Sequence, residues 1–160
     1  MVREQRSLDL NAGYAYLLLC TRFSSTCRVA RVSHGPRLTD DALAAALVGV
    51  RLPERPDTYF VWQIAVSEKF RGRGLAQSLI RDALAAHVAT GVRYVEAHVG
   101  PDNGASAAMF RGLARSLGAQ VEITPDFQSE DYPTEHGPED LWRIGPFDLG
   151  QLRDAQTKQR

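Results

Sequence analysis

The chain has 160 residues, which predicts a single domain over 1–160, and 44% of the residues are apolar, enough for a hydrophobic core. Its 19 Lys and Arg residues balance 19 Asp and Glu residues, so the charge gives no sign of a nucleic-acid partner or of binding to an anionic membrane. Because no apolar run approaches the length of a bilayer span and the opening residues do not resemble a signal peptide, we expect a soluble, cytoplasmic protein.

The N-terminal part is predicted to form one helix and two strands. Asp9 or Asn11 can cap a helix from Ala12 to about Phe23, in which apolar side chains recur at three- and four-residue steps. Alternating residues predict a strand at 26–32. The alanine-rich stretch at 42–52 suits a helix by composition, but its second half has the pattern of a strand, and we favour the strand.

Two cysteines lie in this part of the chain, Cys20 and Cys27. In a cytosolic chain of this size they are expected to be packing residues or free thiols rather than a disulfide. Cys20 continues an apolar run and Cys27 lies in the predicted strand, so packing is favoured over a nucleophilic role.

The central segment is predicted to be a strand, a glycine turn and a helix. Residues 59–66 are apolar at nearly every position, as in a strand that is covered on both faces. The turn Arg-Gly-Arg-Gly-Leu-Ala at 71–76 leads into a helix at 73–90, which Gly91 ends. Glycines let a ligand approach the backbone, and the helix start directs unpaired N–H groups and a positive dipole end toward it. The segment therefore predicts a phosphate site.

Two common phosphate-binding loops are excluded at this turn. A dinucleotide fingerprint needs a third glycine three positions after Gly74, where the chain has Gln77. A mononucleotide loop needs Gly-Lys-Ser or Gly-Lys-Thr, and neither follows.

The C-terminal half continues the alternation of strands and helices. A strand at 92–99 completes a right-handed parallel crossover, and Asp102 or Asn103 can cap a helix that ends at Gly118. We expect further strands at 120–124 and 141–144. An acidic, aromatic loop at 125–138 is expected between them, and a frayed polar tail at 149–160.

The pattern Arg71-x-x-Gly74-x-Ala76 is similar to the acetyl-CoA pyrophosphate loop, Arg/Gln-x-x-Gly-x-Gly/Ala, of the GNAT superfamily of N-acetyltransferases. The resemblance implies an α/β fold: a mixed, mostly antiparallel sheet with a central parallel pair and helices on both faces. It implies acetyl-CoA as the co-substrate, held by the strand before the turn, by the turn itself and by the next helix. The residues are Ile64, Ala65, Val66, Arg71, Gly72, Arg73, Gly74, Leu75, Ala76, Asn103, Ser106 and Phe110.

One position departs from the superfamily pattern. A tyrosine that often protonates the departing thiolate is replaced here by Phe110, which cannot donate a proton. Either another group or water would have to protonate the thiolate, or backbone dipoles alone would assist its departure. The identity of the general acid therefore stays open.

Four blocks resemble the L-2,4-diaminobutyric acid acetyltransferases of ectoine biosynthesis, at 8–20, 57–66, 101–106 and 136–147. The resemblance implies acetylation of the 4-amino group of L-2,4-diaminobutyrate by a homodimer. Members of this family have a first strand and most of a helix ahead of the first block, where seven residues stand here, so we expect that strand to be missing. The alternatives are acetylation of another small amine or a protein amine, and a coenzyme-binding module without catalysis.

A diamino acid needs anchors of both signs. Glu139 and Asp9 could hold an ammonium group, Trp62 and Tyr14 could line the site, and Arg143 or backbone N–H groups could meet the carboxylate. His136, Glu139 and Asp9 are the candidates for removing a proton through water. Purely structural interpretations of these residues remain open: Asp9 could serve only as a helix cap, Trp62 as a core residue and His136 as a loop residue. Gly137-Pro138 prevents His136 and Glu139 from sharing a helix face, and no metal is expected.

Overall fold

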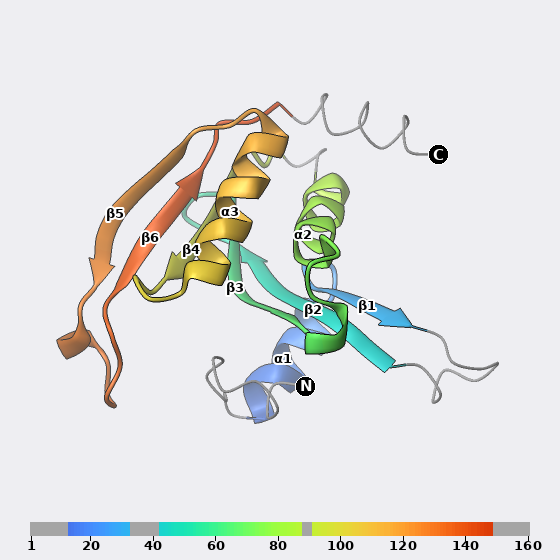
Figure 1. Ribbon diagram of the computed structural model, residues 1–160, viewed down its shortest axis with the longest axis horizontal. Coiled ribbons are helices and arrows are strands. Elements are labelled where there is room, and N and C mark those ends of the chain that lie inside the picture. The colour runs from blue at the N-terminus through green and yellow to red at the C-terminus, as the bar shows by residue number, and fades with distance from the viewer. Residues whose placement is uncertain (1–12, 33–41, 88–90, 149–160) are drawn as a thin grey trace. The chain divides into compact units, whose positions relative to one another are not determined.

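The computed structural model describes residues 13–32, 42–87 and 91–148 (Figure 1). The chain divides into two compact units, which we describe separately. Unit 1 comprises Met1–Val50 and Trp62–Ala83, and unit 2 comprises Arg51–Val61 and Leu84–Arg160. The single domain expected from chain length stays a prediction. The predictions that a first strand is missing and that the tail is frayed concern residues outside the described part.

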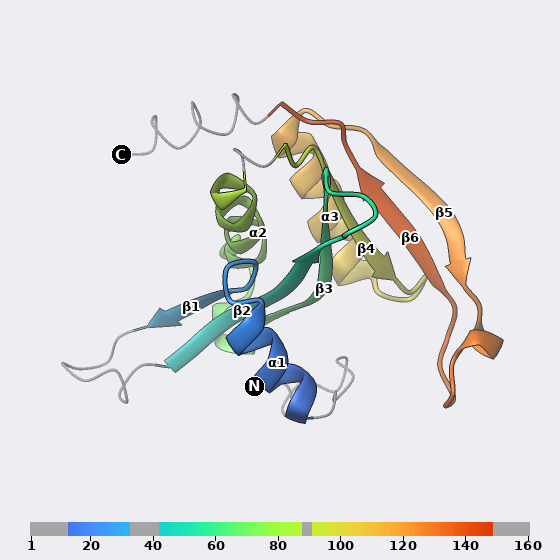
Figure 2. The same cartoon turned by 180° about the vertical axis from the view of Figure 1, so that it is seen from behind.

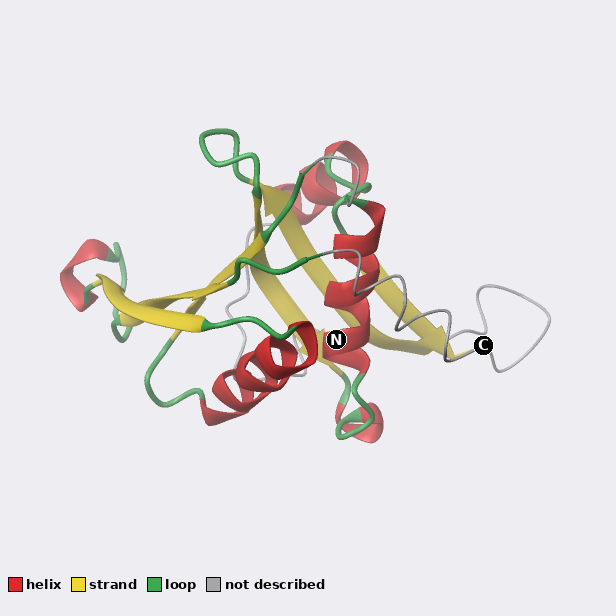
Figure 3. Ribbon diagram, turned by 90° about the horizontal axis from the view of Figure 1, so that it is seen from above, coloured by secondary structure: helices red, strands yellow, loops and turns green. Residues whose placement is uncertain are grey.

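The chain folds into both helices and strands (Figure 3). The elements are α1 (Gly13–Arg22), β1 (Arg28–Val32), β2 (Ala42–Arg51), β3 (Thr58–Val66), the 3-10 turn η3 (Glu68–Phe70), α2 (Leu75–Ala86), β4 (Tyr94–Val99), α3 (Gly104–Leu117), β5 (Val121–Phe127), the 3-10 turn η5 (Ser129–Asp131) and β6 (Glu139–Ile144). The strands are ordered β1-β2-β3-β4-β6-β5. The predicted mixed, mostly antiparallel sheet with a parallel pair, β3 and β4, is confirmed. Within the described residues, none of the helices has the length and apolar character needed to cross a bilayer.

In unit 1, β2 pairs with β1 in antiparallel register, and Ala30 lies opposite Ala45. Figures 1 and 2 show α1 and the first turns of α2 on opposite faces of β2. Ala44, Ala45 and Leu47 are almost fully buried in this arrangement. The strand favoured at 42–52 is therefore confirmed, because cross-strand pairing and burial outweigh the helix propensity of alanine.

In unit 2, the start of β3 pairs in parallel with β4, from Thr58 opposite Tyr94 to Phe60 opposite Glu96. β6 lies between β4 and β5 and is antiparallel to both. Figures 1 and 2 show α3 crossing one face of these strands, and the rings of Phe110 and Trp142 meet there at 6.5 Å.

The predicted loop at 125–138 was too long. β5 continues to Phe127, η5 follows, and β6 begins at Glu139 rather than at 141. Because β5 is the last strand in the sheet order, Pro125 can stand in it without breaking a central ladder. Pairing with β6 therefore extended a strand that the sequence alone predicted to end at 124.

Candidate functional site

The glycine turn lies in unit 1, between η3 and α2. Gly72 and Gly74 both have φ +73°, a backbone conformation that side chains other than glycine rarely adopt. A Cβ atom built on either glycine meets no atom within 4 Å, and residues 71–74 are exposed. The glycines are therefore required by backbone conformation and leave the main chain accessible.

The amides of this turn are available to a ligand. Gly74 O accepts a hydrogen bond from Ser78 N at 3.0 Å, so Gly74 is the residue at the N-terminus of α2, and it has no side chain to cap the helix. Among the residues that the structure describes, none accepts a hydrogen bond from the amides of Gly72 to Ala76. Unpaired N–H groups at a helix N-terminus form an anion site.

Two guanidinium groups lie on the same turn. Arg71 Nε is 3.4 Å from Val66 O, and its Nη1 is 3.8 Å from the Glu68 carboxylate. Arg73 Nη2 is 3.3 Å from Lys69 O, and its guanidinium lies 5.3 Å from the ring centre of Phe70. These contacts are long and exposed, so either group can turn to a phosphate at little cost.

The second half of β3 presents alternate amides to opposite edges. Ser67 N donates to Ala44 O at 2.8 Å, on the β2 side. Because successive amides of a strand point to opposite edges, the Ala65 N–H faces β2 and the N–H groups of Ile64 and Val66 face the other edge. The three residues predicted to contact the coenzyme thus present amides on both edges of the strand.

Trp62 and Tyr14, which were predicted to line the substrate site, are both exposed, and that role stays a prediction. Trp62 is 38% exposed, which excludes the alternative of a core residue, and Tyr14 is 74% exposed. Tyr16 stacks on Trp62 with ring centres 6.5 Å apart and donates to Gln63 Oε1 at 2.9 Å. Tyr16, two residues from Tyr14, was not predicted to be a site residue. Asp9 lies outside the described residues.

At the start of α3, Asn103 is the N-cap, and its Oδ1 accepts a hydrogen bond from Ser106 N at 3.1 Å. Phe110 is 2% exposed and packs on Trp142, within the core. Asn103 and the Ser106 backbone thus form the N-cap of α3, and Phe110 packs in the core. The predicted coenzyme-binding role of the three residues stays a prediction.

Replacing Asn103 with Ala is expected to lower the free energy of unfolding by about 1 kcal/mol, the usual cost of losing an N-cap. Urea denaturation followed by circular dichroism measures this change. Ser106→Ala is the control, because Ser106 contributes its backbone N–H to the cap rather than its side chain. Equal stability of Asn103→Ala and the wild type would contradict the cap.

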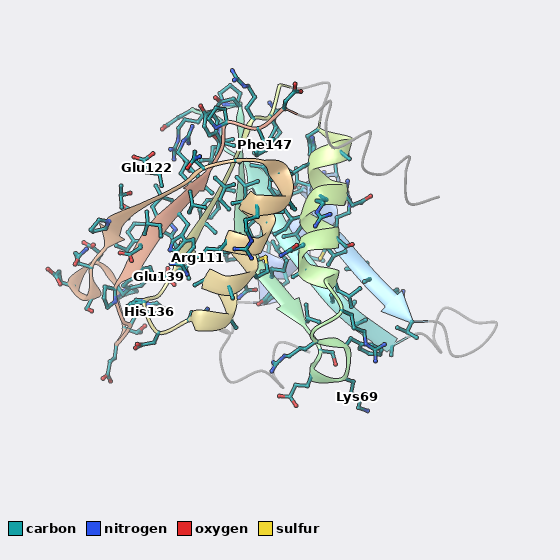
Figure 4. All side chains as sticks on the ribbon, turned by 45° about the horizontal axis from the view of Figure 1, so that its top comes forward. Lys69, Arg111, Glu122, His136, Glu139 and Phe147 are labelled. Atoms are coloured by element: carbon teal, nitrogen blue, oxygen red, sulfur yellow. The ribbon has the colours of Figure 1, made fainter. Side chains whose placement is uncertain are left out.

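Glu139 and His136 come together in unit 2 through a tyrosine. Tyr132 Oη donates to Glu139 Oε2 at 3.0 Å, and its ring stacks on His136 with centres 4.0 Å apart at 22°. His136 Nδ1 is 2.6 Å from Gly137 O, so Nδ1 carries the hydrogen in the neutral ring. Figure 4 shows His136 and Glu139 at the same end of β6.

A second carboxylate and imidazole pair was missed by the sequence analysis. His98 Nε2 lies 2.7 Å from Asp126 Oδ2, and the His98 ring packs against Phe127, with centres 4.4 Å apart, and against Phe60, at 5.4 Å. The two residues are 28 positions apart in sequence. Only the order of the strands in the sheet joins them, and no local pattern could have revealed the pair.

Arg143 is paired within the protein. Glu96 is fully buried, and its Oε1 accepts hydrogen bonds from Arg143 and, at 2.8 Å, from Arg55. The Arg143 guanidinium also lies 3.7 Å from the ring centre of Tyr94. A glutamate within the apolar strand at 92–99 was the signal for such a pair. A role of Arg143 toward a substrate carboxylate would compete with Glu96.

The remaining charged residues of the acidic loop are exposed. Asp131 Oδ2 accepts from Gln128 N at 2.7 Å in the cap of η5, and Glu135 is exposed. Across the described ranges, no group of three or more His, Cys, Asp and Glu side chains is arranged to hold a metal ion.

Comparison with known proteins relates these features to a family. Residues 12–114, more than half of the chain, match the profile of the Acetyltransferase (GNAT) family. The chain is 44% identical over 147 residues to the L-2,4-diaminobutyric acid acetyltransferase of Nocardia farcinica (strain IFM 10152). These aligned residues cover 92% of this chain and 72% of that protein. It is 40% identical over 152 residues to the protein of the same name from Chromohalobacter salexigens, covering 95% and 76%.

A solved structure agrees with these relatives. The fold is similar to that of diaminobutyrate acetyltransferase EctA from Paenibacillus lautus, solved in complex with its substrate L-2,4-diaminobutyric acid and coenzyme A. The TM-score is 0.81 at 34% identity, over 92% of this chain and 86% of that chain. The resemblance inferred from the glycine turn and the four sequence blocks is thereby confirmed. The chain belongs to the acetyltransferase (GNAT) family.

Proposed function

We propose that this acetyl-CoA-dependent N-acetyltransferase acetylates the 4-amino group of L-2,4-diaminobutyrate, the step before ring closure to the compatible solute ectoine. The observation that carries the proposal is the 44% identity to a diaminobutyrate acetyltransferase across almost the whole chain. The similarity to EctA, which was solved with this substrate and coenzyme A, supports it.

The glycine turn fits the diphosphate of acetyl-CoA. Its amides from Gly72 to Ala76, which have no acceptor among the described residues, lie at the start of α2 with Arg71 and Arg73 beside them. Each amide bonded to a phosphate oxygen is a charge-assisted hydrogen bond in a field that favours negative charge. The Ile64 amide, on the edge of β3 away from β2, is a donor for the acetyl and pantetheine part.

The reaction needs a neutral amine and a stabilised oxyanion. The amine nitrogen loses a proton and attacks the thioester carbonyl carbon, a C–N bond forms, and the C–S bond breaks. The thiolate that leaves takes up a proton. Glu139 and His136 are the candidates for accepting the proton of the ammonium group through water, and backbone N–H groups of β3 are the candidates for stabilising the oxyanion. No side-chain nucleophile is required.

Glu139 is proposed to bind an ammonium group of the substrate. Its carboxylate is half-buried at the start of β6 and is oriented by the Tyr132 hydroxyl. Glu139→Gln keeps the shape and removes the charge, so we expect kcat/KM for the diamine to fall about 10-fold or more, or about 1.4 kcal/mol. Steady-state kinetics measures this, with Glu122→Gln as a control on an exposed glutamate of β5. Unchanged constants would remove Glu139 from the site.

The substrate assignment is tested with a panel of diamines and peptide amines at saturating acetyl-CoA, with mass spectrometry to locate the acetyl group. We expect L-2,4-diaminobutyrate acetylated on the 4-amino group to be the preferred product. Preference for another amine would overturn the substrate, and coenzyme binding without turnover on any amine would favour a non-catalytic module. A cytoplasmic homodimer is part of the proposal, and light scattering tests the dimer.

A further inference from the structure

Tyr132 contacts both residues that were predicted to be catalytic, although nothing in the sequence singled it out. Its hydroxyl donates to Glu139 Oε2 at 3.0 Å, and its ring lies flat against His136 at 4.0 Å. Tyr132 is half-buried and follows η5, outside any helix or strand. Its position therefore depends on contacts with other side chains.

A bulge in β5 brings a second aromatic ring, that of Phe127, to Tyr132. Val121, Ile123 and Pro125 lie opposite Ile144, Trp142 and Asp140, but Phe127 lies opposite Glu139, so Asp126 is an extra residue in the strand. Directly opposed residues share a face of the sheet, and side chains alternate along a strand. Without the extra residue, Phe127 would share the face of Val121 instead of the face of Glu139.

The bulge is held by a specific contact and supports the tyrosine. Asp126 is bonded to His98 at 2.7 Å, and Phe127 packs on the same imidazole. The Phe127 and Tyr132 rings also pack together, nearly perpendicular to each other, with centres 5.9 Å apart. Tyr132 thus contacts both Phe127 and His136, and these contacts hold the ring whose hydroxyl meets Glu139.

We propose that Tyr132 is a positioning residue that determines specificity for a diamine by orienting the Glu139 carboxylate toward the substrate's α-ammonium group. The inference rests on the proposed function. During acetyl transfer the 4-amine must be neutral, whereas the α-amine stays protonated and needs a negative partner. When Tyr132 holds one oxygen of the Glu139 carboxylate, the other oxygen points in a fixed direction. This lowers the entropic cost of ordering the carboxylate when the substrate binds.

The experiment compares two substrates with and without the tyrosine hydroxyl. Tyr132→Phe should raise KM for L-2,4-diaminobutyrate about 10-fold, the loss expected when one hydrogen bond to a charged group is removed, with KM for acetyl-CoA unchanged. KM for 4-aminobutyrate, which lacks the α-amine, should stay the same. Tyr94→Phe is the matched control, a half-buried tyrosine on β4 that packs against Arg143.

A double-mutant cycle separates positioning from a general structural effect. Because Tyr132 acts through Glu139, Tyr132→Phe should add almost nothing in the Glu139→Gln background. Additive losses, or an equal loss toward 4-aminobutyrate, would overturn the inference. So would unchanged kinetics of Tyr132→Phe.

Calorimetric titration of L-2,4-diaminobutyrate into the CoA-saturated protein distinguishes this inference from the proposed function. Binding that Tyr132→Phe weakens, without turnover in the wild type, would overturn the proposed function and leave the inference standing. Acetylation of the diamine by the wild type, with equal binding in Tyr132→Phe, would do the reverse. No binding to the wild type would overturn both.

Discussion

Replacing Gly74 with Val is expected to abolish coenzyme binding and with it all acetyl transfer. Gly74 has φ +73°, at which a β-branched side chain is strained, and its bare backbone lies where the amides of the turn are exposed. The valine would shift the backbone of the turn and cover its amides. We therefore expect two or more charge-assisted hydrogen bonds to the diphosphate to be lost. We expect the Kd for CoA to rise at least about 100-fold, measured by calorimetry.

Gly91→Val is the matched control for this prediction. Gly91 has φ +76°, and a Cβ built there also meets nothing within 4 Å, so the substitution brings comparable backbone strain outside the glycine turn. The control should lose stability and retain CoA binding. Micromolar affinity retained by Gly74→Val would show that the diphosphate does not bind at this turn.

Replacing Arg143 with Met is expected to cause the largest loss of stability, about 3–5 kcal/mol of unfolding free energy, the cost of breaking a buried ion pair. Glu96 is fully buried, and its Oε2 has no hydrogen-bond partner among the described residues. The ion pairs of Arg143 and Arg55 with Oε1 therefore compensate for the cost of burying the negative charge. Arg143 also packs on Tyr94 and approaches Thr58 Oγ1 at 3.4 Å. Urea denaturation measures the change.

Two comparisons test the cause of that loss. Arg55→Met should cost less, because the Arg55 side chain is 48% exposed and Arg143 would still compensate Glu96. The double variant Glu96→Met with Arg143→Met should recover much of the stability, since an apolar pair of similar volume leaves no buried charge. A double variant as unstable as Arg143→Met would contradict the electrostatic explanation.

The glycine turn shows how much of a site can be predicted from local sequence. Its conformation requires φ near +73°, which glycine permits, so the residues themselves indicated the geometry. The helix end at Gly118 was predicted for the same reason, and the N-cap, predicted at Asp102 or Asn103, is Asn103, because caps depend on residues within a few positions. The resemblance of four blocks supplied the family and the substrate class.

The contacts of Trp62 and Glu139 were less predictable. Whether Trp62 belonged to the core was left open, and its exposure and its stacking on Tyr16 come from the packing of α1 in unit 1. Tyr132 was missed because only the folded path of the chain between η5 and β6 brings its hydroxyl to Glu139. The pair of His98 and Asp126 was missed because a bulge and the order of three strands bring it together.

The sequence by itself determined the conformation of the glycine turn, the start and end of α3, most of the strands and helices, and the family, whereas the helix predicted at 73–90 is observed at Leu75–Ala86. These depend on backbone preferences and on periodicity within short windows, which the order of residues states directly. The tertiary structure alone decided which side chains surround Glu139 and which cations neutralise Glu96. Such contacts arise from strand register, and a single extra residue in β5 places Phe127 on the face of Glu139.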